Sequence, residues 1–386
     1  MTNDEGAGVS ALEEPKDGEG DVAMGGEQPA GAAATDNFVS GAGADDDNDQ
    51  DRVGLEESPL LMSEVPWNPA KAREKTTEIA MESWGAPAFW LSRTPVLAAF
   101  AAGRATALVI DVGAANLSIT ALHDGTVLKK SIQRSPTGGE WLSAQIRSML
   151  SSHDPRIDIV PTYKVADKKP VDAGAPAQAR LVDFGFPITS SFHAYEQEVT
   201  LKTFKESVVE VWHQGSRYLE SPANEEYVAS QPGPVYEFPD GLNQMWREQR
   251  YRVVEGMFDA NAQYPILEAD RDTFSTLLPT QTIPDMVRNA LGSVDADLRG
   301  NLLANVVVTG GTSLIRGFTD RLHVELSNMY PAMRIRIQAA GHTTERRFGS
   351  WIGGSILASL GSFHQMWVSR KEYDEQGANI VEKRCK

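Results

Sequence analysis

The chain has 386 residues, of which 41% are hydrophobic, and its formal net charge is −17. Residues 1–57 hold 16 acidic and 2 basic residues, hence −14, which leaves −3 for the remainder and argues against binding to a nucleic-acid backbone or sequence-specific DNA binding. The single cysteine, Cys385, excludes an internal disulfide and a cysteine metal site, and no apolar run is long enough to span a membrane.

The cysteine usage and the absence of a basic-then-apolar leader pattern favour a reducing compartment, the cytosol or the nucleus. Residues 1–57 are mainly Gly, Ala, Asp and Glu, so they cannot bury enough surface to offset the entropy lost on ordering. We therefore predict a disordered acidic segment, with GADDDNDQD as a solvated tract. A surface that contacts basic histones is the more specific alternative.

From Ser58 onward, helical and strand patterns alternate, which indicates an α/β fold. We expect the remainder of the chain to divide into regions 58–135, 136–290 and 291–386. In chain order we predict a short apolar run at 58–69, a helix at 71–84, a strand at 87–92, a helix at 94–103 and a β-hairpin at 105–128. An extended surface insertion at 151–187 follows, then a helix at 195–212 and strand-like pieces at 235–241 and 249–258. The last part has a helix end, buried strand, Gly-Gly turn and helix at 301–330, an alternating strand at 333–340, and an apolar helix at 349–369 followed by a tail.

Two loops of small residues follow predicted strands and could approach a phosphate. Asp111–Asn116 lies between the strands of the hairpin, and Thr309–Thr312 leads from a strand into a helix. Small residues let backbone N–H groups face an anion, and a helix N-terminus adds a favourable dipole. Taken alone, each loop is a weak signal, because Gly-Gly after a strand is usually just a tight turn and an Asp at a strand end is often a simple cap; neither loop matches the Walker or dinucleotide pattern.

Several longer stretches are more specific in combination. NVVVTGGTSLIRGFTDRL at 305–322 is followed about twenty residues later by ERRFGSWIGGSILASLGSFHQMWVSRKEYDEQG, and SEVPWNPAKAREK, VLAAFAAGRATALVIDVG and YEFPDG precede them. These passages resemble the actin family over most of the chain after Ser58, least closely at 151–187. GHTTERRFGSW, GSFHQMW and Trp67 are similar to the nuclear actin-related proteins of the fourth class.

The resemblance implies an actin-like fold, which is a duplicated ribonuclease-H-like fold of the Hsp70-type ATPases. It also implies a site for ATP with Mg or Ca, in which Asp111 would contact the ion weakly, through its water shell. Without the resemblance, Lys205 and Glu206 would indicate only a solvated pair on a helix. The positions that match the family's nucleotide site are Asp111, Gly113, Gly139, Lys205, Glu206, Gly310, Gly311, Thr312 and Arg347.

The same comparison implies that the groups needed for hydrolysis are absent. Ala114-Ala115 replaces an acidic-glycine pair, Thr94 replaces the glutamine that positions the attacking water, and Ser118 replaces an assisting histidine. Phosphoryl transfer depends on such positioning, so we expect any bound ATP to be structural and not hydrolysed. At Ile315 an apolar contact replaces a stacking tyrosine.

The first half of the actin-like fold is incomplete in this sequence. Only one strand–Asp-x-Gly–strand hairpin is found where the family has two, so we expect weakened nucleotide binding and exposed apolar edges. A truncated product or gene model is one interpretation of the short N-terminal region.

A partner cleft is also implied by the resemblance. Ile356, Leu360, Phe363 and Trp367 recur at helical spacing, which on pattern alone is most simply a core helix. In actins, part of this region lines a cleft that suits an amphipathic helix. The matching positions are Phe100, Gly103, Ile352, Leu357, Leu360 and Met366.

These features give three hypotheses. The favoured one is a non-catalytic, non-polymerising nuclear scaffold of chromatin-remodelling and histone acetyltransferase complexes, because it needs none of the lost residues. Its expected partners are actin, the helicase-SANT-associated helix of a remodelling ATPase, acetyltransferase complex subunits and histones or the nucleosome, with no membrane partner. The alternatives are an actin-like ATPase that uses Asp111 and a cytoskeletal filament subunit, which would need the missing outer subdomain.

Overall fold

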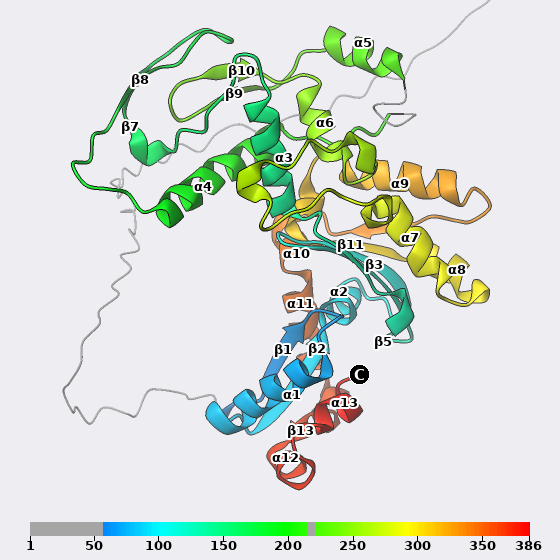
Figure 1. Cartoon of the computed structure of the whole chain (residues 1–386). Helices are drawn as coiled ribbons and strands as arrows, with labels where there is room; N and C mark the ends of the chain where they lie inside the picture. Colours follow the sequence, from blue (N-terminus) through cyan, green and yellow to red (C-terminus); the bar gives the residue numbers. More distant parts are fainter. Residues whose placement is uncertain (1–56, 215–220) are drawn as a thin grey trace, which may run out of the picture. The chain divides into compact units, whose positions relative to one another are not determined.

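The computed structural model describes residues 57–214 and 221–386. Within them the largest sheet lies in the strand order β12-β11-β3-β4-β5, with β6 paired to β4 (Figure 1). β3 and β4 are antiparallel, whereas β11 is parallel to both β3 and β12. The strands are β3 (Ala107–Val112), β4 (Leu117–His123), β5 (Thr126–Val127), β6 (Gln133–Ser135), β11 (Val306–Thr309) and β12 (Ile337–Ala339).

The two faces of this sheet are covered by different helices because side chains alternate along each strand. Leu108 and Ile110 of β3 belong to a large core shared with many helices, whereas Ala107 and Val109 pack toward α2 (Thr94–Ala101). The helices that contribute to the large core are α3 (Gly139–Ser151), α4 (Ser190–Val208), α6 (Gln249–Glu255), α7 (Ile283–Gly292), α8 (Ala296–Leu303) and α9 (Phe318–Met329).

A smaller sheet has the order β1-β2-β13. β1 (Leu60–Glu64) is parallel to β2 (Ala88–Arg93), and β13 (Val368–Ser369) is antiparallel to β2. α11 (Gly349–Ser359) crosses α2 closely, because a Cβ at Gly353 would lie 1.8 Å from the Leu97 carbonyl oxygen. The remaining helices of this part are α1 (Ala70–Glu78), α10 (Thr343–Arg347), α12 (Arg370–Gln376) and α13 (Ile380–Arg384).

The expected surface insertion at 151–187 is largely exposed, as predicted, and it carries a two-stranded ladder. This ladder joins β7 (Val165–Lys169) to β8 (Gln178–Leu181), and a second joins β9 (Val235–Glu237) to β10 (Asn243–Met245). A short helix, α5 (Pro222–Ser230), lies nearby in the chain. The predicted disordered segment lies outside the described residues, except for Glu57.

Most predicted elements are confirmed, among them the hairpin at 105–128 and the strand at 87–92. One prediction was wrong: residues 249–258 are not a strand, since 249–255 form α6, whose buried Val253 and Val254 face the large core. α4 begins at Ser190 and ends at Val208, earlier than the predicted 195–212. The apolar helix ends at Ser359, because Leu360 is extended and a 3-10 turn follows at 361–365.

Candidate functional site

The two small-residue loops meet at the carboxyl ends of neighbouring parallel strands. β11 pairs with β3 so that Thr309 is level with Asp111, and the loops that follow therefore lie side by side. Thr312 Oγ1 donates a hydrogen bond to the Gly113 carbonyl oxygen (2.8 Å), and the Gly139 N–H donates to the same oxygen (3.0 Å). This edge of a parallel sheet is where open α/β folds bind ligands.

Glycine is required at two of these positions by close backbone approach. Gly310 has φ +92°, and a Cβ there would lie 2.3 Å from the Val112 carbonyl oxygen and 2.7 Å from Asp111 Oδ1. A Cβ at Gly139 would lie 2.9 Å from Thr312 Oγ1. Both distances are shorter than real Cβ contacts, so side chains at these positions would push the two loops apart.

A cavity of about 910 Å³ opens beside the joined loops. Its volume is within the range of small-molecule sites. It is lined by six of the residues predicted for the nucleotide site, namely Gly139, Lys205, Glu206, Gly311, Thr312 and Arg347. Asp111, Gly113 and Gly310 do not line the cavity. Asp111 pairs with Thr309 of β11, the Gly113 carbonyl accepts from the Gly139 N–H, and the Gly310 N–H donates to the Arg346 carbonyl, so these residues connect the segments around the cavity.

Sequence reasoning missed one side of this cavity, which is a face of α4. Tyr195, Val199 and Lys202 line it together with Lys205. Their spacing of three to four residues is the repeat of a helix face, so this signal was present in the sequence. The other lining residues are Ala114, Glu140, Glu198, Glu206, Val209, Leu314, Ile315, Arg316 and Thr343.

Lys205 is anchored in the cavity wall. Its Nζ donates hydrogen bonds to the Gly139 carbonyl oxygen (2.5 Å) and to Ser143 Oγ (2.7 Å). Ser143 Oγ in turn donates to Glu198 Oε1 (2.5 Å), and Arg147 Nη1 donates to Glu198 Oε2 (3.2 Å). Burial lowers the pKa of Lys205, and the charge of Arg147 lowers it further. The ammonium therefore fixes the start of α3 against α4.

Glu206 and Arg347 form an ion pair between α4 and α10 at the cavity. Arg347 Nη2 donates to Glu206 Oε1 at 2.8 Å, and both side chains are about half exposed. Because exposed ion pairs contribute little to stability, this pair is free to rearrange when a ligand competes for either partner.

Asp111 is a half-buried residue at the end of β3. Its side chain is on the sheet face that also carries Ala107 and Val109, and no described side chain pairs with it. Burial raises the pKa of Asp111 to about 6. No cluster of three or more His, Cys, Asp or Glu side chains suited to a metal occurs among residues 57–214 and 221–386. A metal ion bound near Asp111 would therefore take its other ligands from water or a bound anion.

The cavity fits a nucleotide in its backbone donors and charges. The N–H groups of Ala114 and Ala115 have no acceptor in the described part of the chain, and Ala114 lines the cavity. Lys202, Lys205, Arg316 and Arg347 of the same lining outnumber its acidic side chains, which are Glu140, Glu198 and Glu206, by one. Free backbone donors and cations at a loop of small residues are what a phosphate group requires.

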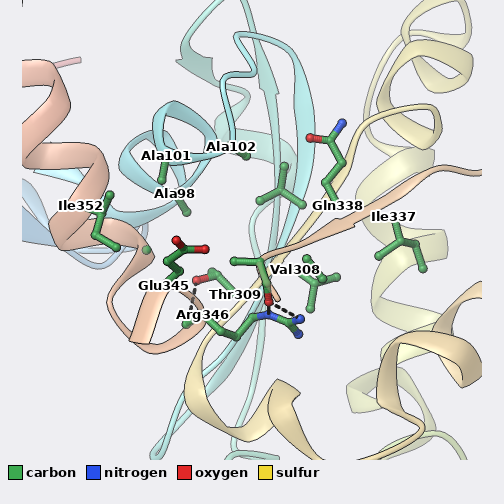
Figure 2. A pocket seen from close by; sticks show the side chains of 14 residues that line it. Ala98, Ala101, Ala102, Val308, Thr309, Ile337, Gln338, Glu345, Arg346 and Ile352 are labelled. Carbon is green, nitrogen blue, oxygen red and sulfur yellow. Dashed lines mark hydrogen bonds between the residues drawn. The ribbon is translucent and has the colours of Figure 1, made fainter. Parts of the chain in front are cut away.

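A second cavity, of about 550 Å³, lies between α2, α10, α11 and strands β11 and β12. Figure 2 shows Ala98, Ala101 and Ala102 of α2 on one side of it and Ile337 and Gln338 of β12 on another. Its wall includes Arg346, whose guanidinium donates to the Ala340 carbonyl oxygen (2.9 Å from Nε). Of the predicted cleft residues, Ile352 lines this cavity.

The other predicted cleft residues lie near the two crossing helices. Leu360 and Met366 are exposed, Phe100 is half-buried, and Gly103 has φ +64° with open space around it. Leu357 is buried in the core beneath the small sheet and offers no surface. Within the described residues, no helix is both long and apolar enough to cross a membrane.

Comparison with known proteins identifies the family. The profile named Actin matches residues 41–386. A protein of Gibberella zeae named actin-related protein 4 is 61% identical over 375 residues, which cover 97% of this chain and 74% of that protein.

Proteins with the same name are found in other organisms. The one from Neurospora crassa is 64% identical over 332 residues, covering 86% of this chain and 70% of that protein. The one from Arabidopsis thaliana is 35% identical over 332 residues, covering 85% of this chain and 72% of that protein. With the sheet, the paired loops and these matches in agreement, the chain belongs to the actin family.

Proposed function

We propose that this actin-related protein is a non-catalytic, non-polymerising scaffold subunit of nuclear chromatin-remodelling and histone acetyltransferase complexes. In this role it docks beside actin on a helix of the remodelling ATPase and contacts acetyltransferase complex subunits and histones. The observation that carries the proposal is the apolar surface along α11 and the turn after it. Trp351 is 73% exposed there, and Ile356, Leu360 and Met366 are each more than 40% exposed.

An exposed apolar surface of this kind favours a binding role. α11 is held against α2 at Gly353, so the surface is presented by a pair of rigid helices. An amphipathic helix can bury such side chains by its own apolar face. The cavity beside Ile352 extends this surface toward β12 and offers room for a further apolar side chain.

The candidate nucleotide site supports a non-catalytic role. Thr94, Ala114 and Ser118 offer no carboxylate, amide or imidazole to order a water. Ser118 is also buried opposite Asp111 in the hairpin. Since phosphoryl transfer depends on positioned groups, these side chains are poorly suited to hydrolysis.

ATP in this proposal is a structural ligand. The loops at Ala114 and Gly311 would receive its phosphates, Lys205, Glu206 and Arg347 would line its adenosine side, and Asp111 would lie toward its Mg or Ca ion. Bound ATP would add a multiply charged phosphate chain that neutralises the cations of the lining.

An ATPase that uses Asp111 is the second candidate. The observation in its favour is the pKa of Asp111, which at about 6 lies near the range of a general base. Phosphate release by the purified chain distinguishes the two functions.

The docking role is tested with aspartates at the exposed surface. The double variant Leu360→Asp, Met366→Asp keeps the core intact, because both side chains are exposed. We expect it to lose at least about tenfold in affinity for actin bound to a remodelling-ATPase helix, since charge replaces apolar contact. Leu278→Asp, at a residue that is 61% exposed elsewhere, is the matched control. Equal binding by all three proteins, or no binding by the wild type, would refute docking here.

A further inference from the structure

The Lys205 ammonium lies beside the joined small-residue loops. Its Nζ donates to the Gly139 carbonyl oxygen (2.5 Å) and to Ser143 Oγ (2.7 Å). A Cβ at Gly139 would lie 3.7 Å from this Nζ and 2.9 Å from Thr312 Oγ1, so the ammonium is close to the loop at Thr312. An ammonium has three N–H donors. Because Lys205 lines the cavity, its third donor is available to a ligand there.

A chain of hydrogen bonds continues from Lys205 to residues outside the cavity. Ser143 Oγ donates to Glu198 Oε1 (2.5 Å), and Arg147 Nη1 donates to Glu198 Oε2 (3.2 Å). Arg147 also donates twice to Asp270, from Nη2 to Oδ1 (2.6 Å) and from Nε to Oδ2 (3.1 Å). Asp270 is 8% exposed, and neither it nor Arg147 lines the cavity. Hydrogen bonds to both carboxylate oxygens therefore fix Glu198 beside Ser143 and Lys205.

The charge of Lys205 depends mainly on the Glu198 carboxylate. Burial lowers the pKa of Lys205 and the charge of Arg147 lowers it further, while Glu198 opposes them more strongly than Glu206 or Glu140 does. Lys205 Nζ lies 3.8 Å from Glu198 Oε1, whereas Glu206 is paired with Arg347. The charged groups on the elements around Lys205 are Glu140 and Arg147 of α3, Glu198, Lys202 and Glu206 of α4, Arg316, and Arg347 of α10.

We propose that Glu198, clamped by Arg147 and Asp270, is a positioning residue of the candidate nucleotide site, which holds the Lys205 ammonium so that its third N–H donates to a polar atom of the nucleotide. This role rests on ATP being the structural ligand proposed above. A carboxylate that acted alone in this lining would only repel phosphate, so its loss would strengthen binding at every pH. Acting through Lys205, its loss weakens binding only where Lys205 gives up its proton, at high pH.

The first test needs no nucleotide. Glu198→Gln removes the charge and is expected to fold, because the Glu198 side chain is 39% exposed. Glu196→Gln is the matched control, since Glu196 lies on the same helix outside the cavity lining. Acetic anhydride modifies neutral amines, so acetylation of Lys205 in the full chain, read by peptide mass spectrometry from about pH 6 to pH 10, reports its titration. We expect the midpoint to fall by about one pH unit or more in Glu198→Gln and to be unchanged in Glu196→Gln.

Asp270→Asn extends the same measurement to the far end of the hydrogen-bond chain. Without the Asp270 charge, Arg147 is less compensated and draws the Glu198 carboxylate toward itself, away from Ser143. We expect the Lys205 midpoint to fall in this variant too, although by less than in Glu198→Gln.

ATP binding is then measured by titration calorimetry at pH 6 and pH 9. We expect Glu198→Gln to bind ATP at least as tightly as the wild type at pH 6, where Lys205 is protonated in both proteins. At pH 9 we expect it to bind at least about tenfold more weakly, because the charge-assisted donor is lost. Comparison with the wild type at each pH cancels the titration of ATP itself, and Glu196→Gln should match the wild type at both.

Two results would overturn the role of Glu198. One is an unmoved Lys205 midpoint in Glu198→Gln, and the other is a ratio of variant to wild-type affinity that is equal at the two pH values. Absence of ATP binding by the wild type would instead refute the structural ligand and, with it, donation to a nucleotide. The acetylation measurement separates these cases, because it reports the contact of Glu198 with Lys205 in the ligand-free chain.

Discussion

Asp111, at the end of β3, is the residue of the candidate site whose pKa departs most clearly from its ordinary value. Its folded pKa of about 6 exceeds the unfolded value of 3.8, so the folded state binds more protons between these values. Its contribution to stability is therefore retained below about pH 4 and lost as the pH rises to about 6. The carboxylate is then a half-buried charge with no partner among the described side chains.

Asp111→Asn removes this penalty. We expect the variant to be more stable than the wild type by about 1–3 kcal/mol at pH 8 and by much less at pH 4, since a shift of one pKa unit corresponds to about 1.4 kcal/mol. Urea unfolding at the two pH values measures the difference. A stability gain of equal size at pH 4 and pH 8 would show that Asp111 titrates normally.

The residues of the candidate nucleotide site could be placed from the sequence only in part. The glycines were predictable, because a strand followed by Gly-Gly needs close backbone approach, and Gly310 has that geometry. The hydrogen bonds of Lys205 to Gly139 and Ser143 could not be predicted, since they depend on how α3 meets α4. A charged pair on a helix has the same pattern whether it faces solvent or a cavity.

At the scale of elements, Arg73 joins the two ends of the described chain. It is 1% exposed and binds Glu64 of β1, Glu382 of α13 and the Cys385 carbonyl oxygen (2.5 Å from Nη2). A buried ion pair of this kind is costly to break, because removing one partner leaves the other charges without compensation. Arg73 of α1 therefore helps to hold α13 in place, together with the buried side chains of Ile380 and Val381.

Arg73→Met should destabilise the chain by about 3–5 kcal/mol and loosen α13. Cys385 reports the loosening, because it is 1% exposed and burial raises the pKa of its thiol to about 11. We expect iodoacetamide to modify Cys385 much faster in this variant than in the wild type. Lys75→Met, which breaks the exposed pair with Glu78, should change stability by less than about 1 kcal/mol. An unchanged alkylation rate in Arg73→Met would contradict this role of Arg73.

Element predictions succeeded where the local pattern is strong and failed where packing decides. The β-branched run at 108–110 specified a strand, and the hairpin formed as expected. Residues 249–255 are helical instead of extended, because α6 packs over α3, where a Cβ at Gly256 would lie only 2.8 Å from Trp141. That contact joins residues 115 positions apart in the chain, so no local pattern reports it.

In the whole molecule, the fold places the two candidate sites on different elements. The small-residue loops lie at the carboxyl ends of β3 and β11, while the apolar surface lies along α11 and the turn after it. The family resemblance predicted this fold from motifs that span the chain. The exposure of Ile356 and Leu360 required the structure, because residues of a helical apolar stripe are most simply expected to face a core.

The central claim is that this chain is a docking subunit and not an ATPase. Steady-state phosphate release from Mg-ATP by the purified, contaminant-free chain tests it most directly, with Asp111→Ala measured beside the wild type. We expect neither protein to release phosphate above the rate of buffer alone, because Thr94, Ala114 and Ser118 offer no carboxylate, amide or imidazole to order a water. Steady release by the wild type that disappears in Asp111→Ala would contradict the claim.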